Sequence, residues 1–259
     1  MSQWTEFLRI QLLLPTAKLL LGMKNQYFGD INDYRKYGIL RALQSQGNFR
    51  VLVAWMLTND DGGPDGRNRS YLRNPATWKR YDPALFSGLA DLMLSTRSPR
   101  VSLMHDAALL ANTAYFQDLV PDGRDERETW RRRLLDAAKN ADLVFLDPDN
   151  GIEVPSKPIG RKDSSKYVAW QEIESLAALG CSTLIYQHYR RESREVFVKR
   201  IVSELRRRTG ARYTQAFRTA HVSFLLAAQA RHEAGLRDGI SLLQEQWHGQ
   251  LDPTGFVDS

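Results

Sequence analysis

Apolar residues occur along this chain in two alternating kinds of run, which predict alternating strands and helices. Short and continuously apolar runs such as VLVAWML and LVFL have the length of buried strands, whereas runs with apolar residues three and four positions apart predict helices. We expect strands at residues 49–57, 100–104, 142–146, 182–187, 213–217 and 222–227. We expect helices at residues 34–46, 83–95, 107–116, 125–139, 168–179, 194–208 and 230–247.

The order of these elements predicts the fold class. Strands that are apolar throughout and separated by helices are typical of a parallel sheet covered on both faces. We therefore expect a single α/β domain with a Rossmann-like, doubly wound and mainly parallel sheet, helices on both faces, and a C-terminal antiparallel hairpin. The domain is expected to span residues 23–259. Residues 1–22 suit either a peripheral amphipathic helix or a helical extension ahead of the domain, and the pattern that begins at Met23 favours the extension.

Charge and cysteine content narrow the class of protein. Lys and Arg number 36 against 30 Asp and Glu, and the basic residues cluster at 131–133, 161–166, 190–200 and 206–208. This excess favours a polyanionic partner, although basic helix faces also keep a protein in solution. The single cysteine, Cys181, excludes an internal disulfide and a thiolate zinc site, so the cytoplasm is the expected location. The N-terminal apolar run is too short and too interrupted to span a bilayer.

Polar residues follow four of the expected strands, and they predict a common site. In a doubly wound sheet the ligand lies outside the carboxyl ends of the strands, where the strand order reverses. The polar groups that follow the strands lie at residues 59–63, 105–106, 147–150 and 187–190. We therefore expect these four groups to converge.

The first two groups are the expected cofactor side of the site. Glycines let the backbone approach a cofactor closely, and carboxylates accept hydrogen bonds from ribose hydroxyls or hold a charged amine. The loop after the first strand has no G-x-G-x-x-G spacing, so a plain surface turn stays open, and Asp106 suits a helix cap equally well. The expected cofactor-binding residues are Asn59, Asp60, Asp61, Gly62, Gly63, His105 and Asp106.

The run ADLVFLDPDNGIEV contains the expected reaction centre. Asp147 ends an apolar strand, where it can accept a hydrogen bond from an amine or hydroxyl, Pro148 fixes the chain direction, and Asn-Gly forces a tight turn. A turn with solvated carboxylates is the structural alternative. Lys36 lies three residues after Asp33 on one helix face, which suits an ion pair or contact with a phosphate or carboxylate. The expected catalytic residues are Asp147, Asp149, Asn150 and Lys36.

Basic and aromatic residues elsewhere suggest how a substrate is held. The loop GRKDSSKY suits phosphate contact and also suits an ordinary solvated loop. Tyr186 and His188, at the end of a strand, can stack on a base, although a histidine in this place is often structural. The expected substrate-binding residues are Asp33, Arg161, Lys162, Lys166, Tyr186, His188 and Arg190.

Taken together, these motifs resemble the class I S-adenosylmethionine-dependent methyltransferases, nearest the ribosomal RNA large-subunit methyltransferase J family, which methylates an adenine exocyclic amine. That family has a G-N-x-x-D-x-x-K-H segment before its first strand, and Gly29, Asp33 and Lys36 match it, with Asp and Tyr in place of Asn and His. Its D-P-P-Y motif corresponds to D-P-D-N at residues 147–150. The later elements also follow a similar order, through a long basic helix to a terminal hairpin and helix.

The resemblance implies S-adenosylmethionine as cofactor and a nucleic acid or nucleotide as substrate. Asn150 stands where the family has its base-stacking aromatic residue and Asp149 where it has the second proline, so the resemblance implies the fold more strongly than an adenine target.

Two further hypotheses stay open. One is a magnesium-dependent nuclease or phosphodiesterase in which Asp60, Asp61, Asp147 and Asp149 hold Mg²⁺. The other is a nucleic-acid-binding protein that keeps the scaffold without its chemistry.

Overall fold

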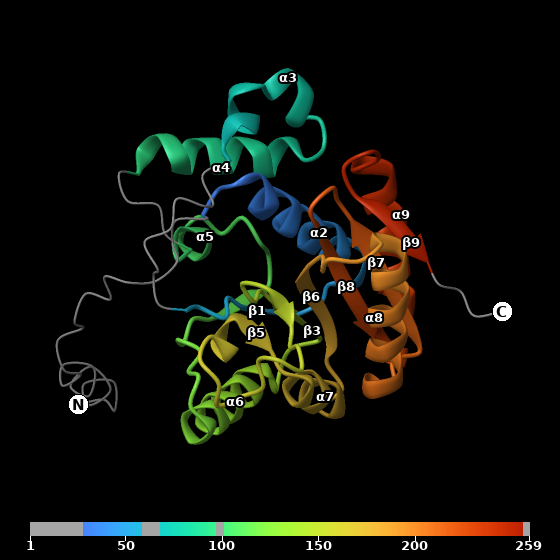
Figure 1. Cartoon of the computed structure of the whole chain (residues 1–259). Coiled ribbons are helices and arrows are strands. Elements are labelled where there is room, and N and C mark those ends of the chain that lie inside the picture. The colour runs from blue at the N-terminus through green and yellow to red at the C-terminus, as the bar shows by residue number, and fades with distance from the viewer. Residues whose placement is uncertain (1–27, 59–67, 97–100, 256–259) are drawn as a thin grey trace, which may run out of the picture.

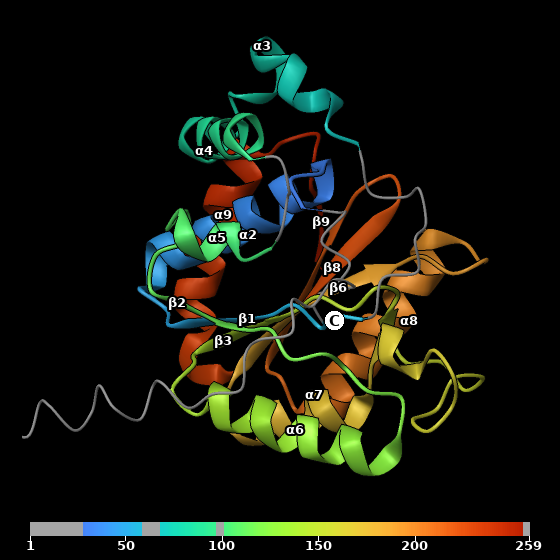
Figure 2. The same cartoon turned by 90° about the vertical axis from the view of Figure 1, so that its left-hand side faces the viewer.

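Strand β1 (Val51–Ala54) separates two apolar cores. Its alternating side chains point to opposite faces, so that Val51 and Val53 belong to one core, whereas Leu52 and Ala54 belong to the other. The same alternation continues in the neighbouring strands. The fold is therefore a sheet between two layers of helices, as Figure 1 and Figure 2 show in two orthogonal views.

The protein is described by a computed structural model over residues 28–58, 68–96 and 101–255. Within these ranges the main sheet has seven strands in the order β2-β1-β3-β6-β8-β7-β9. The strands are β1, β2 (Thr113–Phe116), β3 (Leu143–Leu146), β6 (Ser182–His188), β7 (Tyr213–Arg218), β8 (Val222–Ala228) and β9 (Asp252–Gly255), and a separate small sheet pairs β4 (Gly151–Ile152) with β5 (Tyr167–Val168).

Strand direction changes only toward the C-terminal side of the main sheet. Strands β2, β1, β3 and β6 are parallel. Strand β8 is antiparallel to both of its neighbours, β6 and β7, and β9 is antiparallel to β7. The result is a mixed α/β sheet in which β7 and β8 form an antiparallel pair inside the sheet, because β9 pairs with the outer side of β7.

Helices cover both faces of the sheet. Helices α2 (Ile31–Gly47) and α9 (Glu233–Gln246) lie on one face, and α4 (Pro83–Ser95) packs on α2. Helices α6 (Arg124–Ala138), α7 (Trp170–Ala178) and α8 (Arg194–Thr209) lie on the other face. The short helices are α3 (Pro75–Trp78), α5 (Leu103–Asp106) and the 3₁₀ turns η3 (Ser70–Arg73), η4 (Ser164–Lys166) and η5 (Ala230–His232). None of the helices in the described part of the chain is long and apolar enough to cross a bilayer.

Two glycines allow α2 and α9 to approach each other closely. A Cβ atom at Gly38 would overlap the indole ring of Trp247, and one at Gly239 would lie 2.8 Å from the carbonyl oxygen of Ala42. The two helices can therefore approach this closely only because neither position carries a side chain. This contact fixes the position of α2, which carries part of the candidate site.

Most of the predicted elements are found within a few residues of their expected ends, but one region was predicted wrongly. Residues 101–104 are not a strand, because the backbone there enters the short helix α5, and residue 100 of the expected strand lies outside the described residues. Residues 107–116 are not a helix, because their second half is β2. The β2 sequence TAYF contains β-branched and aromatic residues that suit a strand. The earlier apolar run VSLM is so short that its pattern does not distinguish a strand from a helix. The strand expected at 49–57 ends at Ala54, and Met56 has a positive φ of 45°.

Candidate functional site

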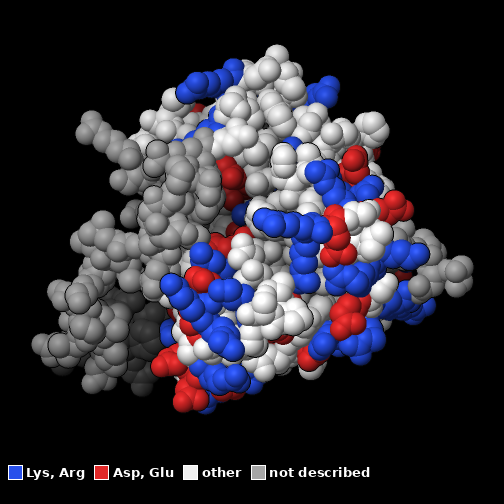
Figure 3. Space-filling model, in the orientation of Figure 1, with Lys and Arg blue, Asp and Glu red and all other residues white. Residues whose placement is uncertain are grey.

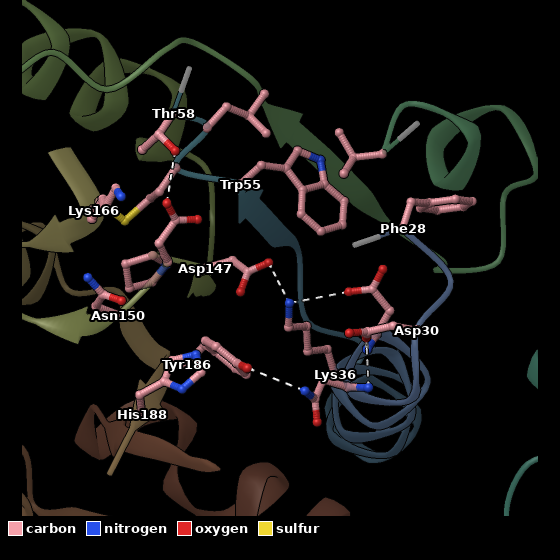
Figure 4. A pocket seen from close by; sticks show the side chains of 17 residues that line it. Phe28, Asp30, Lys36, Trp55, Thr58, Asp147, Asn150, Lys166, Tyr186 and His188 are labelled. Carbon is pink, nitrogen blue, oxygen red and sulfur yellow. Dashed lines mark hydrogen bonds and ion pairs between the residues drawn. The ribbon is translucent and has the colours of Figure 1, made fainter. Parts of the chain in front are cut away.

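A cavity of about 470 Å³ lies at the carboxyl ends of the parallel strands. Strand β1 has β2 on one side and β3 on the other, so the strand order reverses between β1 and β3. The chain after β1 (residues 55–58) and after β3 (residues 147–150) lines the cavity, together with the end of β6 and the first turns of α2. This is the place where doubly wound sheets bind ligands. Figure 4 shows the lining side chains.

Lys36 stands at the centre of the polar side of this cavity. Its Nζ lies 2.9 Å from Asp147 Oδ2 and 3.2 Å from Asp33 Oδ1. The same ammonium group lies 4.5 Å from the centre of the Tyr186 ring, a cation–π contact. The i,i+3 pair expected in α2 is therefore present, and it extends to the D-P-D-N turn 111 residues later in the chain.

The start of α2 is fixed by its own carboxylates. Asp30 caps the helix by accepting hydrogen bonds from the backbone N–H groups of Asn32 at 2.8 Å and Asp33 at 2.9 Å. The Gly29 N–H in turn donates to Asp33 Oδ2 at 2.9 Å. These contacts hold Asp33 and Lys36 in one orientation toward β3.

Burial of several charges shifts their pKa values. Desolvation by burial, reinforced by Asp33, raises the pKa of Asp147 to about 6 even though Lys36 opposes the shift. Burial and the charge of Asp33 raise the pKa of Asp30 to about 7. Burial alone would lower the pKa of Lys36, but Asp147 and Asp33 hold it well above its ordinary value. The lysine is therefore a permanent cation, whereas Asp147 and Asp30 change their charge near neutral pH.

The D-P-D-N turn is held from three sides. Asp149 Oδ2 accepts a hydrogen bond of 2.9 Å from Thr58 Oγ1, which joins the chain after β3 to the chain after β1. The Asn150 N–H donates to the Lys166 carbonyl oxygen at 2.9 Å. Gly151 has a φ of 108°, and a Cβ there would overlap the side-chain amide of Gln187. The glycine of the Asn-Gly pair is thus required both by its φ and by this close approach.

Two aromatic side chains that the sequence patterns do not indicate as site residues also line the cavity. Phe28 and Trp55 line it, and Trp55 stacks on Tyr115 with ring centres 6.1 Å apart. Within the described ranges, Trp55 Nε1 is buried and has no hydrogen-bond partner. A buried donor of this kind is satisfied when a ligand supplies an acceptor. The tryptophan at the end of the VLVAWML run was the available signal.

The cavity carries more negative than positive charge. Its lining contains four carboxylates and two lysines: Asp30, Asp33, Asp147, Asp149, Lys36 and Lys166. Desolvation and the charge of Lys36 lower the pKa of His188, so this histidine adds little positive charge at neutral pH. In Figure 3 acidic atoms lie inside a hollow of this face, whereas many basic side chains, with acidic ones between them, lie on the surface toward α6 and α8. A ligand group that carries positive charge would be favoured inside the cavity.

The structure brings eight of the expected residues together. All of them line this one cavity, and they are Asp33, Lys36, Asp147, Asp149, Asn150, Lys166, Tyr186 and His188. Five of the expected cofactor-binding residues lie outside the described residues, namely Asn59, Asp60, Asp61, Gly62 and Gly63. The role expected for that loop therefore stays a prediction, and so does the role of residues 1–22.

Five other expected residues lie away from the cavity lining, which corrects their predicted placement. His105 and Asp106 belong to α5, and their side chains are 66% and 59% exposed. They do not end a strand, because the second strand is β2. The residues after β2 include Asp118, which forms an ion pair of 2.9 Å with Arg133.

The other three misplaced residues are basic. Arg161 and Lys162 are exposed on the loop between β4 and β5. Arg190 Nη2 lies 3.2 Å from the carbonyl oxygen of Glu153 and 3.5 Å from that of Ile152, so this side chain holds the backbone beside β4. Hydrogen bonding to the protein itself explains its position without a substrate.

A metal and a nucleotide-like cofactor place different demands on this cavity. Over residues 28–58, 68–96 and 101–255, no three carboxylate, histidine or cysteine side chains are grouped as ligands of a metal ion. Two of the carboxylates expected to hold Mg²⁺, Asp60 and Asp61, lie outside those ranges. The volume of the cavity is within the usual range of ligand pockets. The positively charged groups of S-adenosylmethionine would match the carboxylates of its lining. Trp55 and Phe28 would offer flat apolar surface to its adenine ring.

The fold and the cavity define a mixed α/β protein with an acidic cavity at the carboxyl edge of its sheet. No protein-family model, curated protein or solved structure matches the chain. The geometry of the cavity is therefore the main guide to function.

Proposed function

We propose that this protein is an S-adenosylmethionine-dependent methyltransferase-like enzyme that acts on a nucleic acid or a nucleotide. The observation that carries the proposal is the cluster of Asp33, Lys36 and Asp147 in an acidic cavity at the reversal of strand order. The cofactor would occupy the side of the cavity after β1, and the target group would approach Asp147.

The sheet topology supports the Rossmann-like, doubly wound class and, within it, a methyltransferase-like fold. Strand β8 is inserted antiparallel between β6 and β7, which run in the same direction as each other. The later elements of the methyltransferase family that the sequence resembles also run through a long basic helix to a terminal hairpin and helix. A β-strand end with D-P-D-N next to the first strand matches the expected position of the family's catalytic motif.

The charge of the cavity supports a cationic cofactor. When bound, S-adenosylmethionine would supply a methyl group that its sulfonium already activates. The carboxylates near Lys36 would favour the positive sulfonium and amino groups, and the Trp55 N–H would be available to an acceptor on the ligand. Loss of the positive charge after methyl transfer would weaken this attraction and assist product release.

The residues of this chain would position the target and accept its proton. Lys36 holds Asp147 Oδ2, so the other carboxylate oxygen is oriented for a hydrogen bond from an N–H of a target amine. Once the methyl group had passed from the sulfonium to the amine nitrogen, that nitrogen would be acidic, and Asp147 or water would accept its proton. Tyr186 and His188 lie beside this position and would contact a base.

Methyl transfer from tritium-labelled S-adenosylmethionine tests the proposal. Purified protein is incubated with total cellular RNA, genomic DNA or nucleotides, and incorporated radioactivity is counted. We expect transfer to one of these substrates, and we expect Asp147→Asn to lower its rate roughly 100-fold or more. Asp106→Asn is the matched control, because it removes an exposed carboxylate outside the cavity and should leave the rate unchanged. An Asp147→Asn protein as active as the wild type would contradict the assigned role.

A further inference from the structure

A second hollow of about 540 Å³ lies beside the candidate site and has the opposite charge. Three arginines from different elements line it: Arg35 from α2, Arg194 from the start of α8, and Arg218 from the end of β7. Asp252 is the one carboxylate among the described residues of the lining. The hollow therefore has a net positive charge.

The guanidinium groups in this hollow have few partners in the protein. In the described part of the chain, none of the three forms an ion pair with a carboxylate. Arg35 is hydrogen-bonded only to amide groups, with Nη2 2.9 Å from Gln250 Oε1 and Nη1 3.4 Å from Asn32 Oδ1. The Nε groups of Arg35 and Arg218 are buried, and no hydrogen-bond partner for either is found among the described residues.

These contacts differ from those of several other arginines of the fold, which form ion pairs with carboxylates. Arg127, for example, forms a buried pair with Glu172, and Arg207 and Arg208 both bond to Glu204. Buried N–H donors that lack an acceptor cost free energy, and three convergent guanidinium groups also repel one another. An anion in the hollow would relieve both costs, and a phosphate matches the fork of N–H groups on arginine.

The start of α8 adds to the positive potential of this hollow. Arg194 is the first residue of this 16-residue helix, and the capping residue Ser193 makes no side-chain hydrogen bond to the helix. The free N–H groups and the dipole of a helix N-terminus favour an anion. The exposed Glu195 in the first turn of α8 opposes part of this effect, so the arginines supply most of the positive potential of the hollow.

The hollow is joined to the acidic cavity by one side chain. Asn32 lines the cavity and donates to the Tyr186 hydroxyl at 3.5 Å, while its Oδ1 accepts from Arg35. A phosphate is repelled by the carboxylates of the cavity, so a polyanionic substrate needs a cationic contact outside it. The arginine hollow, which Arg35 and Asn32 connect to the cavity, offers such a contact.

We infer that the hollow formed by Arg35, Arg194 and Arg218 binds a backbone phosphate of a polynucleotide whose target nucleotide enters the acidic cavity. This inference rests on the proposed function, because it specifies the substrate of that same site as a polynucleotide rather than a free nucleotide.

Fluorescence anisotropy with labelled 20-nucleotide single-stranded RNA and DNA, measured across a range of KCl concentrations, tests the inference. The Arg194→Gln/Arg218→Gln protein is compared with wild type and with Arg132→Gln/Arg212→Gln, which removes the same charge from exposed positions outside the hollow. We expect the first variant to bind at least roughly tenfold more weakly, and the slope of log K against log[KCl] to fall by about 0.7, since the variant loses one phosphate contact on a single strand. The second variant should stay close to wild type.

Several outcomes would overturn the inference. It fails if the hollow variant keeps the wild-type affinity and salt slope, if both double variants weaken binding equally, or if the wild type binds neither oligonucleotide. Competition by a nucleoside monophosphate or inorganic phosphate at the concentration at which the oligonucleotide competes would exclude the polynucleotide as the preferred source of the phosphate.

Calorimetry with S-adenosylmethionine separates this inference from the proposed function. The hollow variant should bind the cofactor as the wild type does. If the wild type binds no cofactor but oligonucleotide binding depends on the two arginines, the methyltransferase proposal fails and the phosphate site stands.

Discussion

Replacing Lys36 with methionine removes the cation that Asp33 and Asp147 share. The two oxygens now lie 3.2 and 2.9 Å from Nζ, and both the lysine and Asp33 are buried. Breaking a buried ion pair from one side costs about 3–5 kcal/mol, because the remaining charge is left without compensation. We therefore expect Lys36→Met to lower the free energy of unfolding by about 3–5 kcal/mol at pH 8.

The stability lost in Lys36→Met should depend on pH, because protonation of the nearby carboxylates removes the charge that Lys36 compensates. Asp147 and Asp30 have pKa values of about 6 and about 7, so both are largely protonated at pH 5. Neutral carboxyl groups need no cation, and the cost of Lys36→Met should shrink to about 1–2 kcal/mol at that pH. In the double variant with Asp147→Asn, part of the loss at pH 8 should be recovered.

Urea denaturation followed by circular dichroism at pH 5, 6, 7 and 8 measures these differences. Lys139→Met is the matched control, because Lys139 forms an exposed i,i+3 pair with Asp136 and its removal should cost less than about 0.5 kcal/mol. A loss below 1 kcal/mol at pH 8, or a loss that does not change with pH, would refute the view that Lys36 compensates a buried acidic cluster.

Three further variants test separate parts of the structure. Asp147→Asn should raise the free energy of unfolding at pH 8 by at most about 3 kcal/mol, which urea denaturation measures, while it lowers activity. The reason is that the native pKa of Asp147, about 6, lies above the ordinary 3.8, so the charged carboxylate makes the native state less stable as the pH rises through this window. Gly151→Ala should lower the free energy of unfolding by about 2–3 kcal/mol, because the residue has a positive φ and its added Cβ overlaps Gln187. Gly210→Ala is the control: its φ is also positive but the space around it is open, so it should lower the free energy of unfolding by about 1 kcal/mol, and equal losses would show that the contact with Gln187 is unimportant. Burial and Arg231 lower the pKa of His232, so this histidine should destabilise the native state as the pH falls below the ordinary histidine pKa of 6.5. The unfolding free energy of the wild type minus that of His232→Gln should therefore decrease from pH 8 to pH 5, and a constant difference would contradict this.

The sequence predicted those parts of the site that depend on local spacing. Asp33 and Lys36 share a helix face because they are three residues apart, and Asp147 ends a strand because an apolar run stops there. Both facts were readable without coordinates. Their meeting across 111 residues required only that α2 lie against the carboxyl edge of the sheet.

The parts that were missed depend on strand order or on weak local patterns. The true second strand is four residues long, and the apolar run before it looked equally like a strand, so His105 and Asp106 were assigned to the wrong structural position. Arg35 and Arg218 converge because β7 and α2 lie near each other in space, and nothing in either local sequence signals this. Trp55 was read as part of a strand, although the strand ends one residue before it.

Isothermal titration with S-adenosylmethionine and with S-adenosylhomocysteine tests the central claim most directly, namely that the acidic cavity beside Lys36 and Asp147 binds a cationic cofactor. We expect measurable heat with both ligands, tighter binding of the positively charged one, and a smaller difference between the two in Asp147→Asn. No heat and no thermal shift at millimolar S-adenosylmethionine would contradict the claim.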